Sequence, residues 1–342
     1  MTSDLNTRLE GDQVPRAPDV RLCLDHPSRL CSNPPMRLIV IGTGRRARSY
    51  VEVAKKSKAV SWIGVSGNDP GRRDEAAKSW GVEAVESRQL FESADGFILS
   101  NASKDHAESL NRMIPCRKPI LIEKPVTIDA RQTSRILGDI RNHNTPFIVA
   151  FQRRLNRTTR SALNILSNAG TPGEVDLHIL GGHPTDPASI RTCLLREGIH
   201  SLDLLFFILS RYPRASSDIP RPAVLRSDRE CIWTIDGLWP FPVRIHFLSS
   251  AARCLHRNSL FHLRLPGRDM FFDDMSIGSR RPRLLPKAAD NFMARVKCKL
   301  GWIATSREIL SEFLRVMGGG TSALATGDFE GPQILLDRMV ES

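Results

Sequence analysis

The sequence predicts an α/β fold in two parts, a parallel sheet wound with helices followed by an α+β part with a mostly antiparallel sheet. One observation is that apolar, strand-like runs alternate with helix-length segments along residues 36–151, as in βαβ units. The other is that strand-like runs follow one another without long helices in much of the later chain. We therefore expect domains at 36–151 and 152–342, preceded by an extension over residues 1–35.

In the first part, the expected strands are short apolar runs bounded by turn signals or charged segments. They lie at Leu38–Ile41, Val60–Ser66, Gly96–Ser100, Pro119–Ile122 and Pro146–Phe151, and the helices lie at Asp74–Trp80, Lys104–Met113 and Ile128–Asn142, after a first helix through Val51 and Ala54. Because strands connected in this way run parallel, ligands bind beyond their carboxyl ends.

The second part is predicted from the same patterns. Its helices are expected at Arg157–Asn168, His200–Leu209, Arg307–Met317 and Gly331–Val340, and its strands at Gly173–Leu180, Val224–Arg226, Cys231–Ile235, Pro242–Leu248 and Ser259–Leu265. Most of these strands lack helical crossovers, which favours antiparallel pairing.

Composition excludes several classes of protein. The 342 residues carry a formal net charge of +12, but the arginines are dispersed and no nucleic-acid recognition motif accompanies them. No apolar run approaches the ~18 residues of a membrane span, and residues 1–35 lack the apolar core of a signal peptide. The seven cysteines are scattered without metal-ligand spacing. This pattern predicts reduced thiols, no metal site and a cytoplasmic protein with neither nucleic acid nor membrane as partner.

Residues 1–35 are polar and show no amphipathic period, so they predict a mobile extension. Met36 stands directly before the first strand and is an alternative translation start.

The most informative stretch is the turn after the first strand. Gly42 permits a tight turn, Gly44 has no Cβ to block a phosphate, and Ala47 lets the helix approach the strand. This arrangement predicts a Rossmann dinucleotide-binding domain. The alternative is a strand–turn–helix connection that binds nothing. The candidate cofactor-binding residues here are Gly42, Thr43, Gly44, Arg45, Arg46 and Ala47.

The end of the second strand bears on which dinucleotide is bound. NAD-selective domains place an Asp or Glu there to hold the ribose diol, and this position is Gly67 here. Without that acid a phosphorylated ribose is not repelled, so we predict NADP. Asp69 leaves NAD as the alternative, because a small shift of the alignment would restore an acidic position. The residues that suit a 2′-phosphate are Ser66, Asn68, Arg72 and Arg73.

Several motifs occur in one fixed order along the chain. The glycine turn is followed by Ser100–His106, Glu123-Lys124-Pro125, Phe151–Asn156, Glu197–Asp203 and Gly327–Gly331. In this order they resemble the Gfo/Idh/MocA oxidoreductases, relatives of glucose–fructose oxidoreductase and inositol dehydrogenase, over residues 36–342. The resemblance implies hydride transfer between NAD(P) and a hydroxyl or carbonyl carbon of a small polar substrate, such as a sugar, polyol or nucleotide sugar. It also implies cofactor contacts by Asn101, His106 and Glu123 and a homo-oligomer formed through the C-terminal sheet.

Lys124 and His200 are the candidate catalytic residues. Pro125 restrains Lys124 to extended backbone, and an ammonium group held there can stabilise a developing alkoxide. The resemblance makes His200 the proton-exchanging residue, and an imidazole titrates near neutral pH. The alternatives are a surface Glu–Lys pair and a buried histidine satisfied by a backbone partner.

The sequence departs from the family pattern at Arg196, where sugar and polyol dehydrogenases of the family carry an aspartate. An arginine beside His200 lowers the pKa of that imidazole, whereas an aspartate raises it. The alternatives are that Glu197 substitutes from a bent segment, that the proton takes another route, or that the reaction is lost and the protein is a dinucleotide-sensing regulator. The candidate substrate-binding residues are Arg154, Arg196 and Glu197, the arginines for anionic groups.

Overall fold

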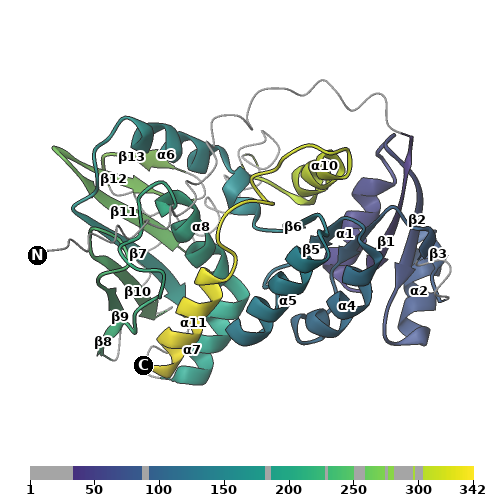
Figure 1. The fold of residues 1–342 in the computed structure, drawn as a ribbon, viewed down its shortest axis with the longest axis horizontal. Coiled ribbons are helices and arrows are strands. Elements are labelled where there is room, and N and C mark those ends of the chain that lie inside the picture. The colour runs from purple at the N-terminus through teal and green to yellow at the C-terminus, as the bar shows by residue number, and fades with distance from the viewer. Residues whose placement is uncertain are drawn as a thin grey trace, which may run out of the picture.

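The computed structural model describes residues 34–86, 92–181, 186–227, 230–249, 259–273, 276–280, 296 and 303–342. The extension predicted over residues 1–35 lies almost entirely outside this range. The described chain forms two sheets that lie towards opposite ends of the long axis, with helices packed around and between them (Figure 1). The described part contains no helix long and apolar enough to cross a membrane.

The first sheet is parallel throughout and has the strand order β3-β2-β1-β4-β5-β6. Its elements are β1 (Met36–Ile41), α1 (Arg45–Ala54), β2 (Val60–Ser66), α2 (Pro70–Trp80), β3 (Glu83–Ala84), β4 (Gly96–Leu99), α4 (His106–Met113), β5 (Ile120–Ile122), α5 (Ala130–Asn142) and β6 (Phe147–Val149). Strand order reverses at β1, between β2 and β4, and a doubly wound sheet binds ligands at such a point. The carboxyl ends of β1, β2 and β4 therefore define the first place to look for a site.

Two helices begin away from their expected residues because an aspartate caps each of them. Asp69 accepts a hydrogen bond from the backbone amide of Arg72 (3.0 Å), so α2 begins at Pro70 rather than Asp74. Asp129 accepts one from the amide of Gln132 (2.8 Å), so α5 begins at Ala130. Asp69 is thus a helix cap.

The second sheet has the order β13-β12-β11-β7-β10-β9-β8, and only its β7–β10 pair is parallel among the described strands. Its part of the chain contains α6 (Arg157–Ser167), β7 (Glu174–Gly181), α7 (Pro187–Cys193), a π-helical turn (Leu194–Gly198), α8 (Ile199–Leu209), β8 (Ala223–Arg226), β9 (Glu230–Ile235), β10 (Val243–Ser249), β11 (Ser259–Leu265), β12 (Arg268–Phe272), β13 (Ile277–Gly278), α10 (Ser306–Met317) and α11 (Gly331–Glu341). The predicted fold class is confirmed. The sequence patterns did not predict β3, α7, β12 and β13.

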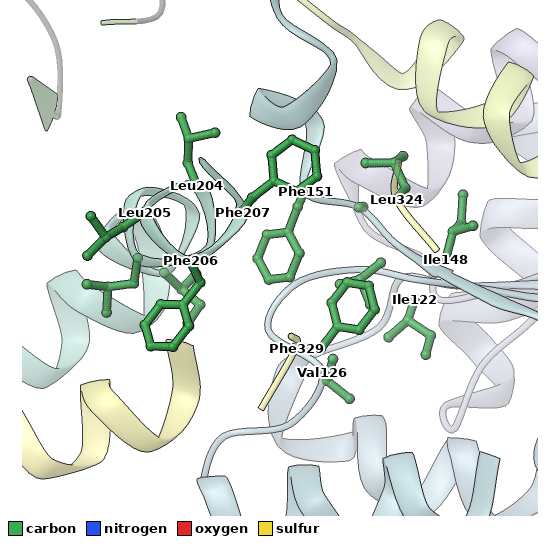
Figure 2. Packing of buried hydrophobic residues seen from close by; sticks show 14 of the residues in the cluster. Ile122, Val126, Ile148, Phe151, Leu204, Leu205, Phe206, Phe207, Leu324 and Phe329 are labelled. Atoms are coloured by element: carbon green, nitrogen blue, oxygen red, sulfur yellow. The ribbon is translucent and has the colours of Figure 1, made fainter. Parts of the chain in front are cut away.

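Helix α8 joins the two halves of the core. All of its residues are buried, and it packs against β7 on one side and α11 on another. Rings of Phe151 and Phe329 stack at 6.4 Å between α8 and the strand ends carrying Ile122 and Ile148 (Figure 2). Helix α10 returns to contact α1 beside the first sheet (Figure 1). The domain boundaries at 36–151 and 152–342 stay a prediction.

Candidate active site

The turn after β1 has the geometry that the glycines require. Gly42 has a φ of +131°, and a Cβ there would stand 2.5 Å from the carbonyl oxygen of Ser100. Only glycine fits this position, because both the backbone conformation and the close approach of the β4 end exclude a side chain.

Gly44 is different, because a Cβ there would meet no described atom within 4 Å. It is the N-cap of α1, and no side chain caps this helix. The amides of the first turn of α1 therefore point, with the positive end of the helix dipole, into open space beside Gly44. An open helix N-terminus of this kind fits a dinucleotide pyrophosphate. Arg45 is exposed and Arg46 half-buried at the same turn.

We expect Gly44→Val to abolish dinucleotide binding while the protein stays folded. The branched side chain would enter the open space beside the helix terminus, where a Cβ meets no described atom within 4 Å, so we expect it to displace the ligand and leave the fold intact. Fluorescence titration with NADPH measures the loss, and circular dichroism confirms the fold. Affinity equal to that of the unmodified protein would show that this turn does not hold phosphates.

A pocket of about 370 Å³ lies beyond the ends of β1 and β2. Helix α4 forms its other wall with Glu108 and Arg112, an ion pair that the sequence analysis did not identify. No sequence signal marks these two, because exposed i, i+4 pairs occur on many helices. The lining residues are Ile41, Ser66, Gly67, Asn68, Glu108, Ser109 and Arg112.

The two arginines suggested to hold the 2′-phosphate of the ribose differ in their surroundings. Arg72 is exposed on α2, whereas the Arg73 guanidinium pairs with Asp74 (2.8 Å) and with Glu86. A 2′-phosphate at Arg73 would therefore compete with these two acids, and the suggestion that Arg73 holds it stays a prediction.

Glu123 is held by two side chains from α1. Its Oε1 accepts a hydrogen bond from Tyr50 Oη at 2.7 Å and forms an ion pair with Arg46 Nε at 2.8 Å, and the carboxyl group is nearly buried. Burial and the Glu123 charge raise the pKa of Tyr50 well above its usual value, so the phenol stays a donor. This network ties α1 to the end of β5. The cofactor contact proposed for Glu123 stays a prediction.

His106 has a positioning role. It is 1% exposed, and its Nδ1 lies 2.9 Å from the carbonyl oxygen of Pro125. Burial lowers its pKa, which keeps the imidazole neutral. A direct cofactor contact by His106 does not agree with this burial, so we correct its role to support of the turn that carries Lys124. Asn101 donates to Ser109 Oγ (2.9 Å) on α4, beside the 370 Å³ pocket.

Lys124 meets the segment that precedes α8. Its Nζ donates to the backbone carbonyl oxygen of Arg196, which lies in the π-helical turn Leu194–Gly198. Such turns frequently occur at functional sites, because they present backbone groups that a regular helix would use internally. Arg196 is exposed, and the side chain of Glu197 lies outside the described part, so the substitution suggested for Glu197 stays a prediction.

His200 is 4% exposed, and its Nδ1 has no hydrogen-bond partner among the described residues. The interpretation of His200 as a core histidine satisfied at the backbone does not explain this nitrogen. Burial lowers the pKa of His200 well below its usual value, and the charges of Lys124, Arg153 and Arg46 lower it further. The lowered pKa favours the neutral imidazole, and the unpartnered Nδ1 gives it a ring nitrogen that can exchange a proton. Phe151 packs against it edge-on at 6.0 Å.

The structure separates the two arginines of the motif after β6. Arg153 donates to the hydroxyls of Ser201 (2.8 Å) and Ser259 (2.6 Å), and its charge acts on His200, although sequence reasoning did not select it. Arg154 instead pairs with Asp203, and both side chains are 0% exposed. Burial raises the pKa of Asp203 to about 6, against the opposing effect of Arg154.

A substrate anion could reach Arg154 only by displacing Asp203 from a closed pair. We therefore correct the predicted substrate-binding role of Arg154 to a structural one. Its neighbour in the sequence, Arg153, is the one that the fold brings to His200.

Comparisons with known proteins agree with this geometry. Residues 36–151 match the model of the Gfo/Idh/MocA oxidoreductase family with an NAD-binding Rossmann fold. A myo-inositol 2-dehydrogenase of Thermotoga maritima is 24% identical over 186 residues, which cover 51% of this chain and 55% of that protein. The chain spans about half the length of the curated relatives it matches.

Solved structures share the fold over most of the chain. The myo-inositol dehydrogenase of Lactobacillus casei, in complex with NAD(H) and myo-inositol, has a TM-score of 0.64 at 14% identity and covers 89% of this chain and 93% of its own. A Gfo/Idh/MocA family oxidoreductase of Vibrio cholerae has a TM-score of 0.59 at 16% identity, with 90% and 96% covered. Residues 36–151 are thus similar to the Gfo/Idh/MocA oxidoreductase family, and the chain shares the fold of solved members of that family over most of its length.

Proposed function

We propose that the protein is an NADP-dependent oxidoreductase acting on a hydroxyl or carbonyl carbon of a small polar substrate, a sugar, polyol or nucleotide sugar. The observation that carries this proposal is the unpartnered Nδ1 of the buried, neutral His200, on the same site as Lys124. When bound, the nicotinamide supplies the hydride acceptor or donor.

The chain's own residues divide the remaining work. The first turn of α1 beside Gly44 holds the pyrophosphate, and Ser66 and Asn68 line the pocket for the ribose end. The Lys124 ammonium donates to the reacting oxygen and stabilises negative charge on it. Neutral His200 accepts the hydroxyl proton during oxidation and returns it during reduction. The reacting oxygen would replace the backbone carbonyl oxygen of Arg196 as the hydrogen-bond acceptor of Lys124 Nζ.

The relatives support a polyhydroxylated substrate. The Thermotoga maritima protein is a myo-inositol 2-dehydrogenase, and the Lactobacillus casei structure contains myo-inositol with NAD(H). A panel of polyols, sugars and keto sugars with saturating cofactor tests the proposal by the absorbance of reduced nicotinamide. Failure of the protein to bind either dinucleotide would overturn it. The homo-oligomer formed through the second sheet stays a prediction.

We expect Gly67→Asp to shift cofactor preference from NADPH towards NADH. A carboxylate there would repel a 2′-phosphate and accept hydrogen bonds from the ribose diol. A Cβ at Gly67 would stand 3.3 Å from the Thr43 methyl group, so Gly67→Ala is the control for the steric change alone. Fluorescence titration of both variants with both reduced cofactors measures the ratio. An unmodified protein that prefers NADH would refute the proposed NADP selectivity.

A dinucleotide-sensing regulator is the second candidate, and Arg196 favours it, because the family's dehydrogenases carry an acid at this position. The two functions differ in turnover. A protein that binds NADPH tightly, turns over none of the panel and gains activity on Arg196→Asp would be the regulator.

A further inference from the structure

Tyr50 directs a buried hydroxyl at the residue that precedes Lys124. It lies in α1, it is 0% exposed, and it is among the largest fully buried side chains of the described chain. A buried phenol usually has a hydrogen-bond partner, and here Oη donates to Glu123 Oε1 at 2.7 Å. Burial and the Glu123 charge raise the pKa of Tyr50, so the hydroxyl keeps its proton and stays a donor to this carboxylate.

Two side chains of α1 hold one oxygen of the Glu123 carboxylate. Tyr50 lies four residues after Arg46 and therefore on the same face of the helix, and Arg46 Nε stands 2.8 Å from the Oε1 that accepts from Tyr50. A carboxylate on a residue that is 7% exposed is costly unless it is paired and hydrogen-bonded, and α1 supplies both partners. Because both contacts are made by Oε1, they also fix the position of the second oxygen, Oε2.

The second oxygen of Glu123 reaches the backbone of Lys124. The amide of Glu123 itself donates to the carbonyl oxygen of Leu99 at 2.9 Å, at the end of the sheet. The next amide, that of Lys124, donates to Glu123 Oε2 at 3.3 Å. On the other side of the lysine, His106 Nδ1 lies 2.9 Å from the carbonyl oxygen of Pro125. The turn that carries Lys124 is thus held by a side chain on each side.

We infer that Tyr50 is a positioning residue of the active site, which acts through Glu123 to fix the backbone from which Lys124 reaches the reacting oxygen. The inference rests on the proposed function, since it concerns the reaction of the same site. The path consists of two hydrogen bonds, one from the phenol to Oε1 and one from the Lys124 amide to Oε2. Displacement of a reacting group by ~1 Å can cost ~100-fold in rate, so a small error in this backbone is enough to slow the reaction.

Tyr50→Phe removes the hydroxyl and keeps the buried ring. We expect kcat with the best substrate to fall ~10-fold, because Lys124 is held less accurately. The KM for the dinucleotide should change less than ~2-fold, because the open turn at Gly44 is untouched. Steady-state kinetics measures both constants, and the melting temperature shows the effect on the fold.

Thr145→Val is the matched control. It also removes a buried hydroxyl, one that donates to the carbonyl oxygen of Ile114 at 3.2 Å. Thr145 precedes β6 and therefore lies at the edge of the parallel sheet opposite the carboxyl ends, where Lys124 is. The control should keep its kcat even where its melting temperature falls.

A double-mutant cycle separates positioning from stability. If Tyr50 acts through Lys124, Tyr50→Phe should cost nothing further in kcat once Lys124→Ala has removed the ammonium group. A hydroxyl that only stabilised the fold would lower kcat by the same factor in both backgrounds.

Amide exchange tests the same contact without turnover. In NMR measurements on the full chain, the backbone amide of Lys124 should exchange several-fold faster in Tyr50→Phe, because a carboxylate that has lost one of its donors protects this amide less. The amide of Ile120, which donates to the carbonyl oxygen of Pro146 at 2.9 Å, is the internal reference and should exchange at an unchanged rate.

Full kcat in Tyr50→Phe, or an equal loss of kcat in both backgrounds, would overturn the inference and leave the proposed function intact. In a protein that turns over no substrate of the panel, unchanged exchange of the Lys124 amide would overturn the inference. Absence of any dinucleotide binding would instead overturn the proposed function.

Discussion

We expect Lys124→Ala to lower turnover by at least ~100-fold, the usual effect of removing an electrostatic donor from a reacting oxygen. The ammonium of Lys124 faces the segment before α8 rather than the glycine turn, so cofactor affinity should change little. Steady-state rates with the best substrate and a parallel NADPH titration separate these two effects. Lys124→Arg keeps the charge with another shape and should recover part of the rate. An alanine variant with the full rate would show that the active site lies elsewhere.

His200→Ala should lower turnover by a similar ~100-fold, because a general acid–base contributes on that scale. Its lowered pKa also predicts the pH profile. Because its pKa is lowered, His200 stays neutral when the pH falls below about 6.5, the usual pKa of a histidine. Oxidation should therefore keep its rate through neutral pH and decline only where the imidazole becomes protonated. Arg153→Gln should raise the pKa of His200, because the Arg153 charge lowers it, and should move this decline to higher pH. An unchanged profile would contradict the role of His200 as the base.

Asp203→Ala should lower the free energy of unfolding by ~3–5 kcal/mol, the typical cost of breaking a buried ion pair. It would leave the fully buried guanidinium of Arg154 without its carboxylate. Arg154 also donates to the carbonyl of Ala323 (3.1 Å) and packs between the rings of Phe207 and Phe329. The pair thus connects the segment after β6, α8 and the loop before α11.

Urea unfolding of Asp203→Ala measures this loss. Glu52→Ala, which breaks the exposed pair with Arg48 on α1, is the control and should cost less than ~1 kcal/mol. The double variant Arg154→Met with Asp203→Leu should recover much of the stability, since it removes both charges from the core together. If Asp203→Ala were as stable as the control, Arg154 would have another compensating partner.

Local patterns determined the fold class and the position of the dinucleotide turn. Apolar runs of strand length that alternate with helices specify a parallel sheet through backbone hydrogen bonding and side-chain burial, which are properties of each segment. The glycines after the first strand predicted the turn. The structure shows why Gly42 is needed there, because its positive φ and its contact with the β4 end exclude a side chain. The helix starts at Pro70 and Ala130 could also have been predicted, since an aspartate precedes each of them.

Only the tertiary structure decided which polar residues reach the site. Arg153 and Arg154 are adjacent and identical in kind, yet one acts on His200 and the other is closed against Asp203. His106 is chemically suited to a cofactor, but packing directs it to Pro125. The physical reason is that the partner of a charged side chain lies far away in the sequence. Its choice depends on burial and competing charges from segments that meet only in the folded chain.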